Sequence, residues 1–104
     1  MKRGEVWWVE FPDPAGQRPA VLVSRNEAYR IRSAITVVPL TRTIRDIPTE
    51  VLLGPAEGVP KKSVANADNV TTVAKRRLQQ HLATLSTGRL AALDRAIKFA
   101  LDLP

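Results

Sequence analysis

The stretch from Arg18 to Thr41 reads RPAVLVSRNEAYRIRSAITVVPLT. Its two apolar runs, residues 19–24 and 34–40, are rich in valine, which is typical of strands covered on both faces. The segment between the runs is polar and contains three arginines. We therefore expect two strands joined by a basic connection, with a candidate reactive side chain at each end of the stretch.

The residues before this stretch predict a first strand over 4–11, GEVWWVEF, because valine and aromatic residues are concentrated there. Trp7 and Trp8 are adjacent, so their side chains point to opposite faces of a pleated strand. We expect one ring to enter the core and the other to lie near a surface or an interface, with core packing of both as the alternative. The loop 12–17 then leads to Arg18, which is expected at a loop–strand junction.

Two residues within the central stretch carry local predictions. Asn26 is a good capping residue and is expected to begin a short helical turn over residues 27–31. Pro39 cannot donate to a ladder, so it predicts that the strand 34–40 lies at an edge or contains a bulge.

The second half of the chain predicts several short strands and one helix. Four further strands are expected after the polar loop 41–48, with a turn at 54–60, at residues 49–53, 63–67, 70–74 and 80–85. Their shortness and spacing favour a small barrel in a single domain, residues 1–104.

The C-terminal segment predicts a helix that Ser86 caps. Asp94 and Lys98 are spaced to form an i,i+4 ion pair on it. The apolar face of this helix is expected to contain Leu90, Leu93, Ile97 and Leu101.

Positive charge is concentrated around the central stretch. The chain has 16 Lys plus Arg against 10 Asp plus Glu, a net charge of +6 and a pI near 10.5. Residues 17–45 hold six arginines and one acid, Glu27, for a local charge of +5. Arginine forms bidentate contacts with phosphate, so nucleic acid is the expected partner, ahead of an acidic protein or a merely solubilising surface.

Several chemistries are excluded or disfavoured by composition. There is no cysteine, and His81 is the one histidine, which rules out thiolate catalysis and a two-histidine ribonuclease and disfavours a zinc site. The acidic residues are scattered singly, and the glycines form no phosphate-binding loop. RNA remains a feasible substrate because its own 2′-hydroxyl supplies the nucleophile, and the enzyme needs only to position and neutralise the phosphate.

Motifs along nearly the whole chain resemble the MazF/PemK toxins of bacterial toxin–antitoxin pairs. Each motif alone is weak, and their order and spacing together are strong. They are Arg3–Val9 (RGEVWWV), Arg18–Ser24 (RPAVLVS), Val37–Thr41 (VVPLT), Pro48–Val51 (PTEV), Gly58–Val64 (GVPKKSV), Lys75–Leu78 (KRRL) and Leu85–Ser86.

The resemblance implies a mainly β, SH3-like small barrel of the CcdB/PemK type with a C-terminal α-helix. It implies a metal-independent, sequence-preferring endoribonuclease without a cofactor, in which Arg18 and Thr41 are the catalytic pair. The expected substrate is single-stranded RNA, either mRNA or the exposed loops of tRNA or rRNA. The expected products carry a 2′,3′-cyclic phosphate and a 5′-hydroxyl, and the cleavage inhibits translation and growth.

Partners and location are also implied. We expect a homodimer, an acidic and partly disordered cognate antitoxin, no membrane association and a cytoplasmic location. RNA contacts beyond the catalytic pair are expected from Arg25, Arg30, Arg32, Arg42 and Asn69.

Two departures from the family pattern bear on substrate choice. The loop before Arg18 is shorter than usual in the family, and Thr71 replaces a common basic residue. Two other functions remain open from the sequence. One is a non-catalytic toxin of the same fold that binds a protein such as DNA gyrase through its terminal helix, and the other is a plain RNA-binding barrel.

Overall fold

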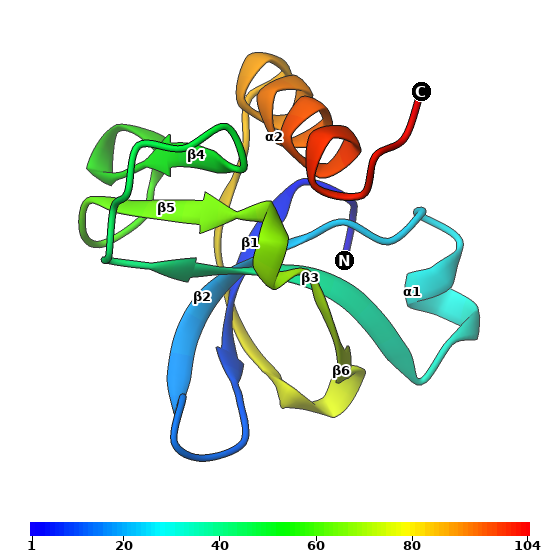
Figure 1. Cartoon of the computed structure of the whole chain (residues 1–104). Helices are drawn as coiled ribbons and strands as arrows, with labels where there is room; N and C mark the ends of the chain where they lie inside the picture. The colour runs from blue at the N-terminus through cyan, green and yellow to red at the C-terminus, as the bar shows by residue number, and fades with distance from the viewer.

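The computed structural model describes residues 1–104, and Figure 1 shows short strands curling beneath one long helix. The elements occur in the order β1 (Glu5–Glu10), β2 (Gln17–Leu22), α1 (Ala28–Ile31), β3 (Ala34–Thr41), β4 (Glu50–Leu53), η1 (Pro55–Glu57), β5 (Ser63–Asn66), η2 (Ala67–Asn69), β6 (Thr71–Ala74), η3 (Lys75–Arg77), β7 (Leu78–Thr84) and α2 (Thr87–Ala100). Every strand predicted from the sequence is therefore confirmed, with shifts of one or two residues at the ends.

The strands form one antiparallel sheet in the order β4-β5-β3-β2-β1-β7, and β6 also pairs with β3. Strand β3 is central, because β2 covers one of its edges while β6 and β5 share the other. The sheet curls into a half-barrel of antiparallel strands with α2 packed on it (Figure 1). This arrangement confirms the predicted mainly β small barrel with a C-terminal helix.

Pro39 lies in this central strand, so the prediction of an edge or a bulge is wrong. It lies opposite Ala20 of β2. On its other side, β6 pairs with β3 only as far as Val37, and β5 begins to pair at Leu40. Pro39 therefore occupies the gap where β3 changes partners, and its missing N–H interrupts no ladder on that edge.

Two apolar clusters fill the space on either side of β1, β2 and β3. The first includes Val6, Val21 and Leu93, all fully buried, and lies under α2. The second includes Val9 and Ile35. Alternate residues of one strand thus enter different clusters, which explains the almost continuous apolar runs in the sequence.

The two tryptophans of β1 point to opposite faces as predicted, but neither is buried in a core. Trp7 packs against the second cluster and remains half-buried. Trp8 is also half-buried and lines a surface hollow. The prediction is therefore confirmed in part: Trp7 packs against a core cluster without being fully buried, and Trp8 lies at the surface.

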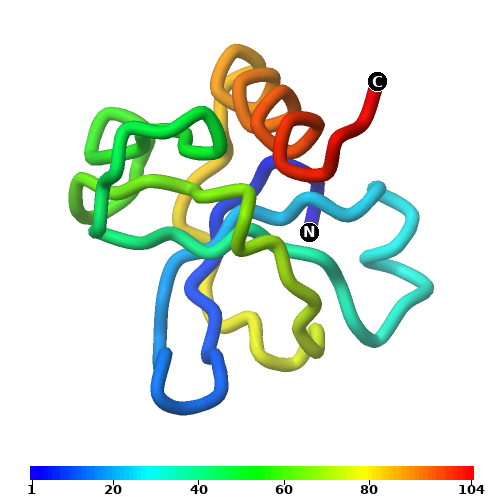
Figure 2. Tube along the Cα trace, viewed as in Figure 1, coloured from blue at the N-terminus to red at the C-terminus, as the bar shows by residue number.

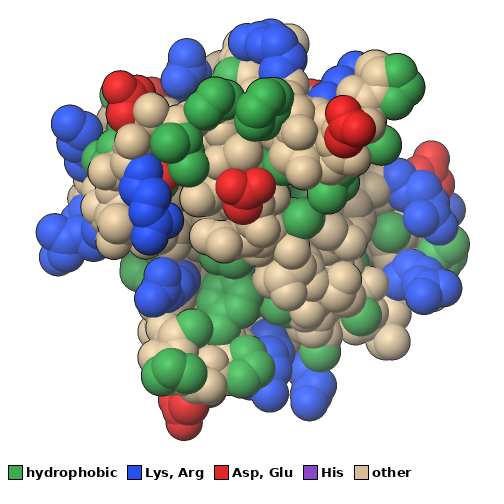
Figure 3. Space-filling view, viewed as in Figure 1, with side chains coloured by type: hydrophobic (Ala, Val, Ile, Leu, Met, Phe, Trp, Pro, Cys, Tyr) green, Lys and Arg blue, Asp and Glu red, His purple; other side chains and the backbone are tan.

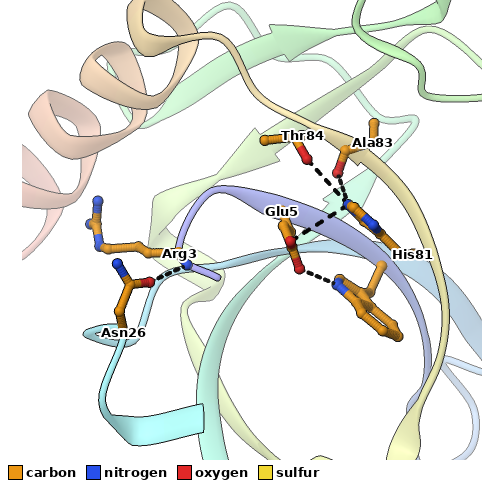
Figure 4. Close-up of polar contacts among 7 residues, drawn as sticks. Arg3, Glu5, Asn26, His81, Ala83 and Thr84 are labelled. Atoms are coloured by element: carbon orange, nitrogen blue, oxygen red, sulfur yellow. Dashed lines mark hydrogen bonds and ion pairs between the residues drawn. The ribbon is translucent and has the colours of Figure 1, made fainter. Parts of the chain in front are cut away.

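The short helix α1 is present, but Asn26 does not cap it. Glu27 occupies the N-cap position and makes no capping bond with its side chain. The Oδ1 atom of Asn26 instead accepts a hydrogen bond from the backbone N–H of Arg3, 2.7 Å away (Figure 4). Asn26 therefore ties the N-terminal segment to the β2–α1 connection.

Helix α2 begins as predicted, since the Ser86 hydroxyl accepts a hydrogen bond from the backbone N–H of Arg89 at 3.1 Å. Leu93 is fully buried, but Leu101 follows the helix and is 51% exposed, so its predicted core position is wrong. The predicted Asp94–Lys98 pair does not form. Asp94 instead accepts from Arg3 Nη2 at 2.6 Å, because tertiary packing brings the N-terminus beside this face of the helix.

Figure 2 traces the chain from the β1–β2 hairpin, which projects at the bottom of the view, to α2, which crosses the top. Neither α1, with four residues, nor α2, with 14, is long and apolar enough to cross a bilayer.

Candidate active site

A surface hollow of about 510 Å³ brings Arg18 and Thr41 together. Figure 3 shows a notch at the left of the molecule, above the β1–β2 hairpin, with hydrophobic side chains inside it and basic side chains nearby. The hollow is lined by Trp8, Gln17, Arg18, Pro19, Leu40, Thr41, Arg42, Thr43, Val59, Pro60, Lys61 and Ser63. Both ends of the stretch from Arg18 to Thr41 therefore reach one concave site.

Strand register explains why Arg18 and Thr41 meet. The β2–β3 ladder pairs Leu22 with Val37 and ends with Ala20 opposite Pro39. Arg18 precedes Ala20 by two residues and Thr41 follows Pro39 by two, so the same register directs both toward one face. The meeting depends on the register of the antiparallel pairing between the consecutive strands β2 and β3.

Arg18 is the second residue of β2, which agrees with the predicted loop–strand junction to within one residue. Its Nε donates to the carbonyl oxygen of Ala15 at 3.3 Å, which connects the side chain to the β1–β2 turn. The Arg18 guanidinium makes only this one hydrogen bond, and no carboxylate forms an ion pair with it. The remaining N–H groups are therefore available for an anion in the hollow.

Thr41 ends β3, where it lies opposite Val64 of β5. Its Oγ1 accepts a hydrogen bond from the backbone N–H of Thr43 at 3.2 Å, which fixes the oxygen at the turn out of the strand. The hydroxyl hydrogen remains free to donate to a ligand. Thr41 thus offers a positioned donor beside a cation.

The opposite wall of the hollow comes from the segment between β4 and β5. Gly58 has a φ of +85°, a backbone conformation that favours glycine. A Cβ atom there would lie 2.8 Å from the Cβ of Ala83 on β7. After this turn, Val59, Pro60, Lys61 and Ser63 line the hollow, and the Ser63 hydroxyl donates to the Lys61 carbonyl at 2.9 Å.

The lining of the hollow is suited to a polyanion. It contains three cations, Arg18, Arg42 and Lys61, and no carboxylate. Trp8 adds an aromatic ring and Thr41 a hydroxyl. Cations close together in a concave, partly desolvated site concentrate positive potential, so a phosphate diester with its neighbouring bases fits this chemistry.

Of the residues predicted to contact RNA, only Arg42 lines the hollow. Arg25, Arg30 and Arg32 are exposed at and beside α1, beyond the opposite end of β3. Asn69 is exposed at the end of η2. The hollow thus joins Arg18, Thr41 and Arg42, and it does not include the other four.

Sequence reasoning missed two lining residues that offer obvious contacts to RNA, Trp8 and Lys61. The sequence pattern predicts Trp8 only as a core, surface or interface residue, and it assigns Lys61 no role beyond its place in the motif that follows the turn. The available signal was the GVPKKSV motif, which contains Lys61, but nothing local indicated that this turn folds against β2.

His81 does not reach the hollow and takes part in a separate polar cluster (Figure 4). Its ring stacks on Trp7 with centroids 5.5 Å apart, and its Nε2 lies 2.9 Å from the Ala83 carbonyl oxygen. The Trp7 indole N–H donates to the Glu5 carboxylate at 2.9 Å. Burial opposes ionisation of Glu5, but the bonds from Trp7 and the Lys2 backbone, with His81 nearby, hold its pKa below the usual value.

The chain matches a known family over nearly its whole length. The family described as "PemK-like, MazF-like toxin of type II toxin-antitoxin system" matches residues 2–101. Over 102 residues the chain is 40% identical to the probable endoribonuclease MazF5 of Mycobacterium tuberculosis, covering 96% of this chain and 92% of that protein. It is 39% identical to endoribonuclease MazF9 of the same species, covering 99% and 98%.

Solved structures agree with this match. An endoribonuclease from Mycobacterial species, in complex with its cognate antitoxin, superimposes with a TM-score of 0.89 at 32% identity, covering 100% of this chain and 97% of that one. MazE–MazF from Deinococcus radiodurans (Form-II) gives 0.82 at 24% identity, covering 100% and 97%. The second likeness concerns the fold alone, and it confirms the barrel type expected from the sequence.

Proposed function

The chain belongs to the PemK-like, MazF-like toxins of type II toxin–antitoxin systems and is an endoribonuclease, and we propose that its Arg18–Thr41 hollow is where RNA is cut. The observation that carries this assignment is the convergence of Arg18 and Thr41 in one hollow lined by cations and free of carboxylates. The substrate is single-stranded RNA, either mRNA or the exposed loops of tRNA or rRNA, because splayed bases enter a concave site that a duplex cannot fill.

The proposed reaction needs no metal ion. The ribose 2′-oxygen attacks the adjacent phosphorus, the bond from phosphorus to the 5′-oxygen breaks, and a 2′,3′-cyclic phosphate and a 5′-hydroxyl result. The attacking hydroxyl loses its proton and the leaving oxygen gains one. Arg18 neutralises the charge that develops on a non-bridging phosphate oxygen, and Thr41 donates to the same phosphate group.

Cleavage of total RNA by the purified protein in EDTA tests this proposal. We expect cuts at a short preferred sequence, with ends that carry a cyclic phosphate and a 5′-hydroxyl. Cutting that disappears with the chelator would refute the metal-independent mechanism. Intact RNA together with inhibition of DNA gyrase would favour the alternative of a non-catalytic toxin.

We also propose that the protein is a homodimer that buries the groove beside α2. This groove of about 490 Å³ lies between α2, β4 and the loop that follows β3. Four of its apolar side chains are more than one third exposed, namely Ile44, Ile47, Leu52 and Phe99. Exposed apolar groups gathered in one groove favour burial against a second copy.

The mass in solution tests the homodimer. Sedimentation of the wild type is expected to give twice 11.5 kDa, and Leu52→Asp is expected to shift the mass toward 11.5 kDa. Leu52 is 52% exposed, so the change leaves the core of the subunit intact. A wild-type mass of one chain at micromolar concentration would contradict the proposal.

The antitoxin proposal rests on charge. Solved relatives are described in complex with a cognate antitoxin or with MazE. This chain has a net charge of +6, so we propose a cognate antitoxin with an acidic, partly disordered segment that folds across the basic hollow and blocks RNA. Because its substrate and this partner are intracellular, we assign the protein to the cytoplasm.

A further inference from the structure

A second basic surface lies at the other end of β3 from the hollow. We call it the α1–η3 surface, and it consists of Arg25, Arg30, Arg32, Lys75 and Arg76. Figure 3 shows basic side chains at the right-hand edge of the molecule, where Figure 1 places α1. None of these residues lines the hollow that contains Arg18 and Thr41.

The pairing of β6 with β3 brings the two parts of this surface together. Ala74 lies opposite Ala34, so η3 begins where β3 begins. The backbone N–H of Lys75 donates to the Ser33 carbonyl at 2.8 Å, and Lys75 Nζ donates to the Tyr29 carbonyl at 2.6 Å. Cations more than 40 positions apart in sequence therefore lie on the same side of the molecule, with Lys75 between Arg30 and Arg76.

The charge on this surface is not balanced within the chain. The ion pairs of the structure are Arg3–Asp94 and His81–Glu5, so no member of the α1–η3 surface takes part in one. Residues 25–32 and 75–76 contain these five cations and one acid, Glu27, which leaves a local charge of +4. Unpaired cations held close together repel one another, and a polyanion relieves that repulsion.

The shape of the surface favours a nucleic-acid backbone over a polypeptide. Two hollows flank Lys75, one of about 400 Å³ that includes Tyr29 and Arg30 and one of about 540 Å³ that includes Thr72 and Arg76. Neither is lined by a carboxylate. Of the large apolar side chains that are exposed, four gather in the α2 groove, where a peptide would find its anchors, whereas the α1–η3 surface has only Ile31 in α1 and Met1 at the edge of the smaller hollow.

We propose that the α1–η3 surface is a second RNA site, which holds substrate phosphates away from the bond that is cut; this inference rests on the proposed function. Strand β3 has eight residues, so its two ends lie about 24 Å apart at roughly 3.4 Å per residue. An oligonucleotide that only fills the hollow cannot reach this surface. A longer RNA can contact both, so the enzyme favours long substrates over short ones.

A charge-matched pair of double variants tests the proposal. Arg30→Gln/Arg76→Gln removes two charges from the α1–η3 surface. The control, Arg45→Gln/Lys98→Gln, removes two charges from exposed positions that line none of the three hollows. Each is assayed on a short RNA of about six nucleotides and on one of about 40 nucleotides that contains the same mapped cut site. We expect the first double variant to lose roughly tenfold in kcat/KM on the long RNA only. The control should match the wild type on both.

Binding supplies a readout that does not depend on cleavage. In an Arg18→Ala background, the slope of log affinity for the long RNA against log salt should fall by about 0.7 for each phosphate contact removed. If both double variants show the same slope and the same long-RNA activity, the inference fails while the proposed function stands. If the wild type cuts neither RNA, the proposed function fails, and the slope still decides whether this surface binds RNA. Weaker binding of a polyglutamate peptide with unchanged RNA binding would assign the surface to an acidic protein and overturn the proposal.

Discussion

At the Thr41 end of β3, three cations line one hollow together with a hydroxyl and an indole ring, whereas at the Ala34 end five cations are spread over the α1–η3 surface and its two shallow hollows. Both ends have the positive charge that phosphate requires, but only the first combines its cations with a hydroxyl in one hollow. Charge density alone therefore does not distinguish a cutting site from a holding site. Convergence of a cation and a hydroxyl on one concave point does, because transition-state stabilisation requires fixed donors on the reacting group.

The largest effect is expected from mutations in the hollow at the Thr41 end of β3. Arg18→Ala and Thr41→Val are each expected to reduce cleavage of a short RNA by about 100-fold or more, as is typical when a transition-state donor is lost. Thr41→Val keeps the side-chain shape and removes only the hydroxyl. Initial rates on the six-nucleotide RNA measure the effect, with Lys98→Gln as the control. Near-normal rates in folded variants would show that Arg18 and Thr41 are not the catalytic residues.

A smaller effect is expected from the lining residues that hold the RNA without facing the reacting phosphate. Trp8→Ala is expected to raise KM by about tenfold through lost base stacking, with little change in kcat. Trp8→Phe retains a ring and is expected to recover most of the loss. Steady-state kinetics on the short RNA distinguish the two parameters. A change confined to kcat would instead assign the ring a role in the chemical step.

The loop that leaves the hollow depends on Glu50. Its carboxylate accepts from the backbone N–H groups of Arg45 at 3.0 Å and Asp46 at 2.8 Å. Glu50→Gln replaces charge-assisted bonds with weaker ones and is expected to lower the free energy of unfolding by about 1 kcal/mol. Urea denaturation measures this loss, and Glu27→Gln is the control because the Glu27 side chain makes no hydrogen bond. Equal stability of the two variants would show that the loop does not need the carboxylate.

At the α1 end, Tyr29 gives a pH-dependent comparison. Its hydroxyl donates to the Ser24 carbonyl at 3.0 Å, and burial raises the pKa of Tyr29 from 10.0 to about 12. The folded state therefore favours the protonated hydroxyl of Tyr29. Its contribution to the free energy of unfolding is fully present below pH 10 and is lost as the pH rises from 10 to about 12. Tyr29→Phe is expected to cost about 1 kcal/mol at pH 7 and to lack that alkaline loss.

Thermal unfolding between pH 7 and pH 12 measures the difference between wild type and Tyr29→Phe. The control is a mutation of equal cost at another site, Ser86→Ala, which removes the α2 cap and should retain the alkaline loss. Parallel pH profiles for all three proteins would contradict the assignment to Tyr29.

Local features of the fold followed from the sequence. Concentrated valine predicted the strands, and Ser86 predicted the start of α2, since a cap depends only on neighbouring backbone groups. Predictions that required knowledge of distant segments were less successful. Pro39 predicts an edge or a bulge although β3 is central and regular at this point, and Asp94 pairs with Arg3, 91 residues away, and not with Lys98.

The residues of the candidate active site were likewise only partly predictable from the sequence. Arg18 and Thr41 were identified as a pair through their resemblance to a family, while Trp8 and Lys61 were missed. The sequence by itself determined which strands form, which helix packs on them, and that positive charge is concentrated around the central stretch. Only the tertiary structure decided that Arg18 and Thr41 share one hollow, and that α1 and η3 form a separate basic surface. The physical reason is that register and strand order arise from long-range pairing, which alternation along a single strand does not encode.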